Sequence, residues 1–178
     1  MHKLHELLRR LCAHNVRFAL IGGMGVILHG GSRVTSYIDV VAPLDEENLH
    51  HICAALGGLN CVFYQHLKRM PAQMLPEKFK GWMSIYLQTE LGIIDILGEL
   101  PEWPQPIEQI IDVAEVVEFA GMPLRVMKLE SLLKLKASLP RPRDRDDAIT
   151  LEKILLVRQE LAAEAEASED SAAGKTGR

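Results

Sequence analysis

The chain has 178 residues, which is enough for one domain with at most a small helical appendage. Hydrophobic residues make up 48% of it and charged residues 25%, so it can bury a real core, and a net charge of −4 excludes the overall basic character of a dedicated nucleic-acid binder. The 3 cysteines are scattered, which argues against a disulfide framework and against a zinc site. No apolar run reaches membrane-spanning length, and the charged N-terminal stretch is unlike a signal peptide, so we expect a cytoplasmic protein with no membrane partner.

An amphipathic helix is predicted at residues 2–14. Leu4, Leu7, Leu8 and Leu11 recur there at the i, i+3, i+4, i+7 spacing of one helix face. This face is expected to pack on the core.

Residues 18–41 read as a strand, a Gly-Gly turn, a short helix, a second Gly-Gly turn and another strand. Gly22 and Gly23 follow the first apolar run directly, and because they lack a Cβ they allow a sharp turn and the close approach of a ligand. The helix that begins there presents unpaired N–H groups, which suit a phosphate. In the second strand, Tyr37 and Asp39 share one face because strand side chains alternate.

Strands and helices continue to alternate in the middle of the chain. Asp45 is a candidate N-cap for the next helix, which ends at a further Gly-Gly pair. Asp95 is conspicuous because it is the single carboxylate in an otherwise apolar strand. Strands are predicted at 61–67, 82–87 and 93–97, a loop at 70–80, one or two helical turns at 107–112, and a hairpin formed by 114–119 and 123–127.

Two helices are predicted at the C-terminal end. The first covers residues 129–138 and is broken by Pro140 and Pro142, and the second begins near residue 145 with Asp144 as its N-cap. The pattern predicts an α+β fold, with a mixed, twisted sheet flanked by helices and followed by C-terminal helices. The expected divisions are an α/β core at 1–127, a helical segment packed on it at 128–165, and a disordered tail at 166–178.

The segment around Asp39 resembles the DNA polymerase β-like nucleotidyltransferase superfamily. It is most similar to the small bacterial branch that includes nucleotidyltransferases of abortive-infection and toxin–antitoxin systems. The sequence departs from that pattern at Tyr37, where the family has the first of two metal-binding aspartates. The matching residues are Gly22, Gly23, His29, Gly30, Arg33, Thr35, Ile38 and Asp39.

The resemblance implies a nucleotidyltransferase-like fold and a Mg²⁺ cofactor, with Mn²⁺ as the alternative ion. By the same resemblance, Asp39 and Asp95 are the metal ligands and catalytic residues, and Asp95 is also the base toward the acceptor hydroxyl. The nucleotide-binding residues that it implies, with Lys134 as the alternative to the lysine, are Gly22, Gly23, Arg33, Thr35 and Lys136.

The arginine-rich turn between the two C-terminal helices has two interpretations. The resemblance places Arg141, Arg143 and Arg145 near the acceptor, whereas an ordinary solvated helix start explains them equally well. Asp144 and Asp147 are expected to cap and pair rather than catalyse. His29 is expected to be structural.

Two functions from different classes follow from these residues. The first is a Mg²⁺-dependent transferase that moves a nucleoside monophosphate from an NTP such as ATP to an RNA, for example tRNA, to a protein or to a small molecule. We expect Tyr37 to weaken it, because a neutral phenol is a poor Mg²⁺ ligand beside a carboxylate. The second is an inactive protein of the same fold that binds a nucleotide or a partner, such as an antitoxin-like protein. A third, weaker hypothesis is a structural subunit that docks through its first or last helix.

Overall fold

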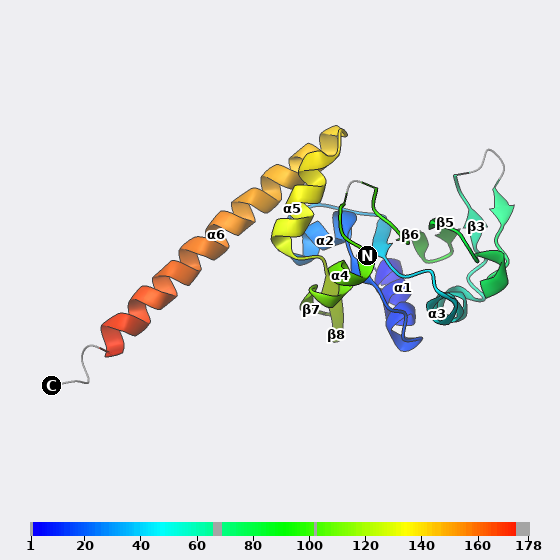
Figure 1. Cartoon of the computed structure of the whole chain (residues 1–178), viewed down its shortest axis with the longest axis horizontal. Helices are drawn as coiled ribbons and strands as arrows, with labels where there is room; N and C mark the ends of the chain where they lie inside the picture. The colour runs from blue at the N-terminus through cyan, green and yellow to red at the C-terminus, as the bar shows by residue number, and fades with distance from the viewer. Residues whose placement is uncertain (1, 66–68, 102, 174–178) are drawn as a thin grey trace.

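The computed structural model describes residues 2–65, 69–101 and 103–173. These residues form an eight-stranded mixed sheet with the strand order β4-β3-β5-β6-β2-β1-β8-β7 (Figure 1). The strands are β1 (Ala19–Leu20), β2 (Tyr37–Val41), β3 (Val62–Phe63), β4 (Met70–Pro71), β5 (Ser84–Thr89), β6 (Gly92–Leu97), β7 (Glu115–Phe119) and β8 (Met122–Val126). The prediction of an α+β fold with a mixed sheet flanked by helices, followed by C-terminal helices, is confirmed.

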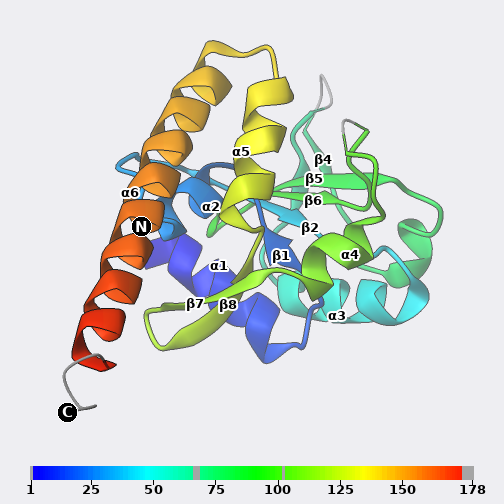
Figure 2. The ribbon, with the colours of Figure 1, turned by 60° about the vertical axis from the view of Figure 1, so that its left-hand side comes forward.

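Helices cover parts of both faces of this sheet (Figure 2). On one face, α1 and α3 pack against the buried side chains of the central strands. On the other face, α4 and α5 form a second apolar cluster with the first part of α6. The helices are α1 (His2–Ala13), α2 (Gly22–Leu28), α3 (Glu46–Leu56), the 3-10 turn η1 (Pro76–Lys78), α4 (Ile107–Asp112), α5 (Leu129–Ser138) and α6 (Pro142–Ala173).

Local sequence signals explain several of these elements. The four leucines of α1 are at most 5% exposed, as their spacing requires. Asp45 caps α3 by accepting the N–H of Asn48 at 2.8 Å. The predicted hairpin turns at Ala120 and Gly121, which both have positive φ.

The edge of the sheet near β3 differs from the prediction. The strand predicted at 61–67 is reduced to Val62–Phe63, and residues 66–68 lie outside the described part of the chain. The segment predicted as a loop at 70–80 adds the edge strand β4, whose Pro71 is tolerated because an edge strand leaves one side unpaired, and the turn η1.

The last helix also differs from its prediction. It begins at Pro142, so Asp144 lies in its first turn and the prediction that Asp144 is the N-cap is wrong; proline is favoured there because the first turn needs no N–H partner. The helix continues to Ala173, and its C-terminal half extends away from the sheet (Figure 1). Residues 174–178 lie outside the described chain, and the disorder of the tail stays a prediction.

No helix within the described ranges is both long and apolar enough to cross a membrane.

Candidate nucleotide site

Asp39 and Asp95 lie side by side on two neighbouring strands. β2 and β6 are parallel, and Asp39 is the register partner of Asp95. Their flanking residues Ile38 and Ile94 are fully buried on the opposite face, so both carboxylates project from the other face of the sheet. Neighbouring strands are about 4.8 Å apart, which brings the two carboxylates within reach of one small cation.

The two glycines after β1 contact Asp39. Gly22 has a φ of +58°, and a Cβ at this position would lie 2.0 Å from Oδ2 of Asp39. The backbone N–H of Gly23 donates a hydrogen bond to the same carboxylate. These glycines form the first turn of α2 rather than a turn before it, and only a residue without a side chain fits at Gly22.

Both carboxylates of this pair are more easily protonated than usual. Burial raises the pKa of Asp39, although Lys136, the Gly23 N–H, Arg141 and Arg33 oppose that shift. Burial also raises the pKa of Asp95 to about 6; a hydrogen bond from the Tyr64 hydroxyl opposes this rise and the charge of Asp39 adds to it.

Tyr64 is a site residue that the sequence did not reveal. Its hydroxyl donates to Oδ1 of Asp95 at 2.7 Å, and burial followed by this contact raises the pKa of the phenol. Tyr64 follows β3, which is separated from β6 by β5. The sequence signal is only a tyrosine at the end of an apolar run, which gives no indication of that neighbour.

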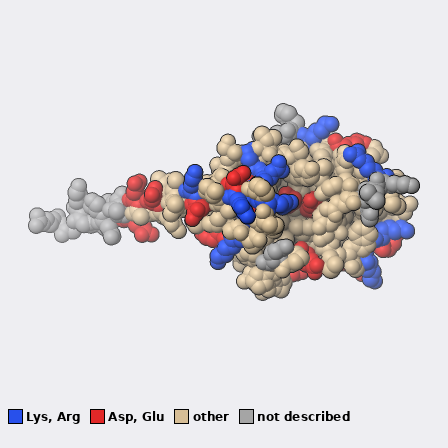
Figure 3. Space-filling view, turned by 90° about the horizontal axis from the view of Figure 1, so that it is seen from above, with Lys and Arg blue, Asp and Glu red and all other residues tan. Residues whose placement is uncertain are grey.

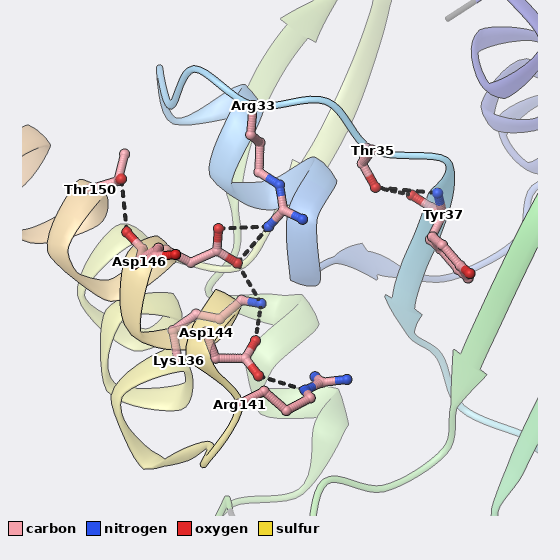
Figure 4. A network of polar contacts seen from close by, with 9 residues as sticks. Arg33, Thr35, Tyr37, Lys136, Arg141, Asp144, Asp146 and Thr150 are labelled. Carbon is pink, nitrogen blue, oxygen red and sulfur yellow. Dashed lines mark hydrogen bonds and ion pairs between the residues drawn. The ribbon is translucent and has the colours of Figure 1, made fainter.

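Tyr37, where the resemblance led us to expect a third carboxylate, lines the same cavity. Its side chain is 39% exposed, and its backbone N–H donates to Oγ1 of Thr35 at 3.2 Å (Figure 4). Thr35 therefore fixes the backbone at the start of β2. The sheet supplies two carboxylates at this point, and the phenol of Tyr37 lines the cavity with them.

A chain of ion pairs closes the opposite side of the site (Figure 4). Nη1 of Arg33 donates to both oxygens of Asp147, at 2.6 and 2.5 Å. Nζ of Lys136 contacts Asp144 at 2.7 Å and Asp147 at 2.9 Å, and Nε of Arg141 donates to Asp144 at 2.7 Å. The side chains of Lys136, Asp144 and Asp147 are at most 7% exposed, so this network joins the loop after α2 to α5 and α6 in the interior.

The carboxylate of Asp144 behaves in the opposite way to those on the sheet. Burial favours a higher pKa, but hydrogen bonds from Lys136 and Arg141 outweigh it and hold the pKa of Asp144 below its usual value. Asp144 and Asp147 therefore pair, as we predicted.

A cavity of about 440 Å³ lies between these two sides. The predicted site residues among its lining are Gly23, Arg33, Thr35, Asp39, Asp95 and Lys136. Other residues that line it are Tyr37, Tyr64, Arg141 and Arg143. Gly22 is not part of this lining and lies against Asp39 instead. Figure 3 shows basic and acidic side chains next to each other on one face of the molecule. The cavity thus places several cations opposite two carboxylates.

The donor set suits one hard cation. Within the described ranges no group of three or more His, Cys, Asp or Glu side chains is arranged to hold a metal. Mg²⁺ takes few ligands from protein and completes its octahedron with water and phosphate oxygens, so two carboxylates that open onto a cavity lined with cationic side chains fit it.

His29 is buried at the end of α2. Its Nε2 lies 2.8 Å from the carbonyl oxygen of Met127, and Nη2 of Arg158 lies 3.2 Å from its Nδ1. These contacts tie α2 to the end of β8 and to α6, which is the structural role predicted for it.

Comparison with known proteins gives matches among solved structures alone. No family model and no curated protein matches the chain. The lincosamide antibiotic adenylyltransferase LnuA, in its lincomycin-bound crystal structure, aligns with a TM-score of 0.62 and 16% identity over 86% of this chain and 97% of LnuA. The antibiotic-resistance factor ANT(2'')-Ia in solution aligns with a TM-score of 0.55 and 16% identity over 97% of this chain and 96% of its own. The crystal structure of ANT(2'')-Ia in complex with adenylyl-2''-tobramycin aligns with a TM-score of 0.53 and 14% identity over 91% of this chain and 96% of that chain.

The chain therefore has the fold of the DNA polymerase β-like nucleotidyltransferases, and the predicted resemblance in fold is confirmed. These neighbours are antibiotic nucleotidyltransferases. The closer similarity to the abortive-infection and toxin–antitoxin branch stays a prediction.

Proposed function

We propose that this chain is a nucleotidyltransferase that binds an NTP in the cavity of about 440 Å³ and transfers its nucleoside monophosphate to an acceptor hydroxyl. The observation that carries the proposal is the in-register pair Asp39 and Asp95 beside the glycines that begin α2. The fold shared with LnuA and ANT(2'')-Ia supports it.

A divalent cation, Mg²⁺ or Mn²⁺, would be held by Asp39 and Asp95. When bound, it neutralises charge on the phosphates and orients the nucleotide. The raised pKa values of both carboxylates support this role, because an adjacent cation offsets the unfavourable burial of the two negative charges.

The remaining cavity residues bind and orient the substrates. Arg33, Arg141 and Lys136 face the carboxylates across the cavity and attract the polyphosphate. A Cβ at Gly23 would lie 2.9 Å from Cζ of Arg33, so this glycine lets the guanidinium approach the backbone. Thr35 holds the start of β2 in place. Asp95 accepts the proton of the attacking hydroxyl.

We further propose that Tyr37 weakens metal binding, since the phenol replaces a carboxylate on the same strand face. The same observation favours a second candidate function, a catalytically inactive protein that binds nucleotide. The two candidates differ in pyrophosphate release.

A small-molecule hydroxyl is the acceptor class best supported by the neighbours, since one neighbour structure holds lincomycin and another holds adenylyl-2''-tobramycin. A tRNA or protein acceptor, an antitoxin-like partner and a cytoplasmic location stay predictions.

The test measures nucleotide binding by calorimetry and pyrophosphate release, with each of the four NTPs, with Mg²⁺ or Mn²⁺, and with lincomycin and tobramycin as trial acceptors. We expect Tyr37→Asp to bind the metal–nucleotide complex about tenfold more tightly than the wild type, and Asp39→Asn to bind it more weakly. Tyr37→Phe is the matched control, because it changes the same side chain without adding a carboxylate.

Three outcomes separate the candidates. Pyrophosphate release by the wild type supports the transferase. Binding without release, even in Tyr37→Asp, supports the inactive binder. Equally strong, Mg²⁺-dependent binding by the wild type and Tyr37→Asp contradicts the weakening by Tyr37.

A further inference from the structure

The hydroxyl of Tyr64 makes the contact that an attacking hydroxyl has to make in the proposed transfer. It donates a hydrogen bond to Oδ1 of Asp95, with 2.7 Å between the two oxygens. A group that gives its proton to a general base must lie within about 2.6–3.2 Å of that base. Since Asp95 is the proposed base, the chain itself supplies a hydroxyl in the position of an acceptor.

The register of the sheet explains how Tyr64 comes to this position. Asp95 is the partner of Tyr86, and the antiparallel pairing of β3 and β5 aligns Phe63 with Leu87. The next residue, Tyr64, therefore comes level with Tyr86 and lies in the row of Asp95. Phe63 packs on the buried cluster of the opposite face, so Tyr64 projects from the face that carries Asp95.

The length of the side chain matters for this contact. β5 lies between β3 and β6, and neighbouring strands are about 4.8 Å apart, so the hydroxyl reaches Asp95 from a backbone two strands away. A serine or threonine at the position of Tyr64 would be too short to bridge that distance. The contact therefore depends on a tyrosine.

Tyr64 also lines the cavity in which the NTP is proposed to bind. The same lining includes the cationic side chains of Arg33, Lys136 and Arg141, which attract phosphates. The phenol and these cations therefore open onto one space, so a nucleotide bound there has the hydroxyl of Tyr64 as a neighbour.

The other tyrosines of the chain differ from Tyr64 in these respects. The chain has 3 tyrosines. Tyr37 lines the same cavity, but its hydrogen bonds with Thr35 use its backbone atoms. Tyr86 lines a different cavity. A hydroxyl nucleophile is weak until an adjacent base removes its proton, and Tyr64 combines such a base with a place in the nucleotide cavity.

We propose that the chain modifies itself, transferring one nucleoside monophosphate from a bound NTP to the hydroxyl of Tyr64. This inference rests on the proposed function and adds an acceptor that belongs to the chain. The product is a phosphodiester between the phenol and the nucleoside.

The reaction step balances with the substrates named. The hydroxyl oxygen of Tyr64 attacks the α-phosphorus of the NTP, so a new P–O bond forms and the bond from the α-phosphorus to the bridging oxygen breaks. Pyrophosphate leaves with that bonding electron pair, and the phenolic proton passes to Asp95.

The modification ends the reaction after one cycle. The esterified Tyr64 has no proton left to donate to Asp95, and its nucleotide occupies the cavity of about 440 Å³ that the next NTP would need. Without an added acceptor, we therefore expect a single nucleoside monophosphate on each chain and a matching amount of pyrophosphate.

Mass spectrometry of the full chain tests the proposal. The protein is incubated with each NTP and with Mg²⁺ or Mn²⁺, without another acceptor, and the intact mass and the modified peptide are then determined. We expect the wild type to gain one nucleoside monophosphate on Tyr64, and Tyr64→Phe to lose the adduct about 100-fold or more. Tyr86→Phe is the matched control, because it removes a hydroxyl from the same row of the sheet, and it should be labelled like the wild type.

Binding of a nucleotide that cannot be transferred is the second measurement. The α,β-methylene analogue of each NTP has carbon in place of the bridging oxygen, so the bond to the leaving group stays intact. Calorimetry should give affinities within about twofold for the wild type, Tyr64→Phe and Tyr86→Phe, because the phosphate-binding cations are unchanged in all three. Loss of the adduct in Tyr64→Phe then reports the loss of the acceptor.

The outcomes distinguish this proposal from the one on which it rests. Absence of an adduct in the wild type, or an adduct on another residue such as Tyr37, overturns the self-modification. Transfer to lincomycin or tobramycin without an adduct on the chain leaves the transferase and refutes modification of Tyr64. Binding of the analogue with neither adduct nor pyrophosphate release overturns both proposals and supports the inactive binder.

Discussion

Two pairs of aspartates face each other across the candidate nucleotide site, and they have opposite environments. Asp39 and Asp95 on the sheet lie partly buried beside one another, and their pKa values are raised. Asp144 and Asp147 on α6 are also buried, but Lys136 contacts both, and Arg33 and Arg141 complete their ion pairs.

The difference separates carboxylates that stabilise the fold from those available to bind a ligand. The α6 pair is compensated by cations within the chain, so it holds α6 and α5 against the loop after α2. The sheet pair lacks that degree of compensation, and a partly buried carboxylate with a raised pKa in a cavity is a candidate functional group. The predictions below change one pair at a time.

The largest effect is expected for catalysis in Asp95→Asn. The amide cannot accept the hydroxyl proton and is a weaker metal ligand, so pyrophosphate release should fall about 100-fold or more. Asp146→Asn, an exposed aspartate between the two buried aspartates of α6, is the control and should retain wild-type activity. Unchanged release by Asp95→Asn would contradict its proposed role.

The sequence predicted the sheet side of this comparison better than the helical side. Strand β2 carries Tyr37 and Asp39 and ends at residue 41 as predicted, because its alternation is local, and the carboxylate of Asp95 stands out in an apolar strand. The meeting of β2 with β6 follows from the resemblance to a known fold and not from either strand alone.

The helical side depends on contacts that the local sequence does not encode. Phosphate contact by Arg33 and Lys136 stays a prediction, but the sequence did not reveal that both side chains pair with α6 carboxylates. That pairing requires the turn between α5 and α6 to return Asp144 to Lys136. Tyr64 was missed for a similar reason, because its partner Asp95 lies beyond β5.

The next largest effect is expected for stability in Asp144→Ala. This change leaves Lys136 with one carboxylate in place of two and removes the partner of Arg141, which should lower the free energy of unfolding by about 3 kcal/mol. Urea denaturation measures it, with Asp146→Ala as the control at an exposed position of the same helix. Equal destabilisation by the two variants would show that the ion pairs of Asp144 add no stability beyond that of an exposed aspartate.

A smaller effect is expected when alanine replaces glycine next to the sheet pair. Gly22→Ala places a Cβ against Asp39 and strains a backbone with φ of +58°, so we expect a loss of about 2 kcal/mol together with weaker nucleotide binding. Gly58→Ala is the matched control, because its φ is +77° and nothing lies within 4 Å of the new Cβ. Backbone strain should lower the free energy of unfolding of Gly58→Ala by only about 1 kcal/mol, and nucleotide binding should be retained. Similar nucleotide affinity in both variants would separate Gly22 from the site.

The smallest effect is a pH-dependent change in the stability of the metal-free protein. The pKa of Asp95 is about 6 in the folded chain, against 3.8 for the ordinary group. The protonated carboxyl therefore contributes fully to folding stability below pH 3.8, and this contribution is lost as the pH rises through 6. Asparagine cannot ionise, so Asp95→Asn should gain stability relative to the wild type across that window, by about 1 kcal/mol after allowance for solvent screening of a partly exposed group. Urea denaturation of both proteins between pH 4 and 8 measures the difference, and a constant difference over that range would contradict the raised pKa. Saturating Mg²⁺ should reduce the gain at pH 8, because the cation supplies the compensation that the α6 pair receives from Lys136 and the two arginines.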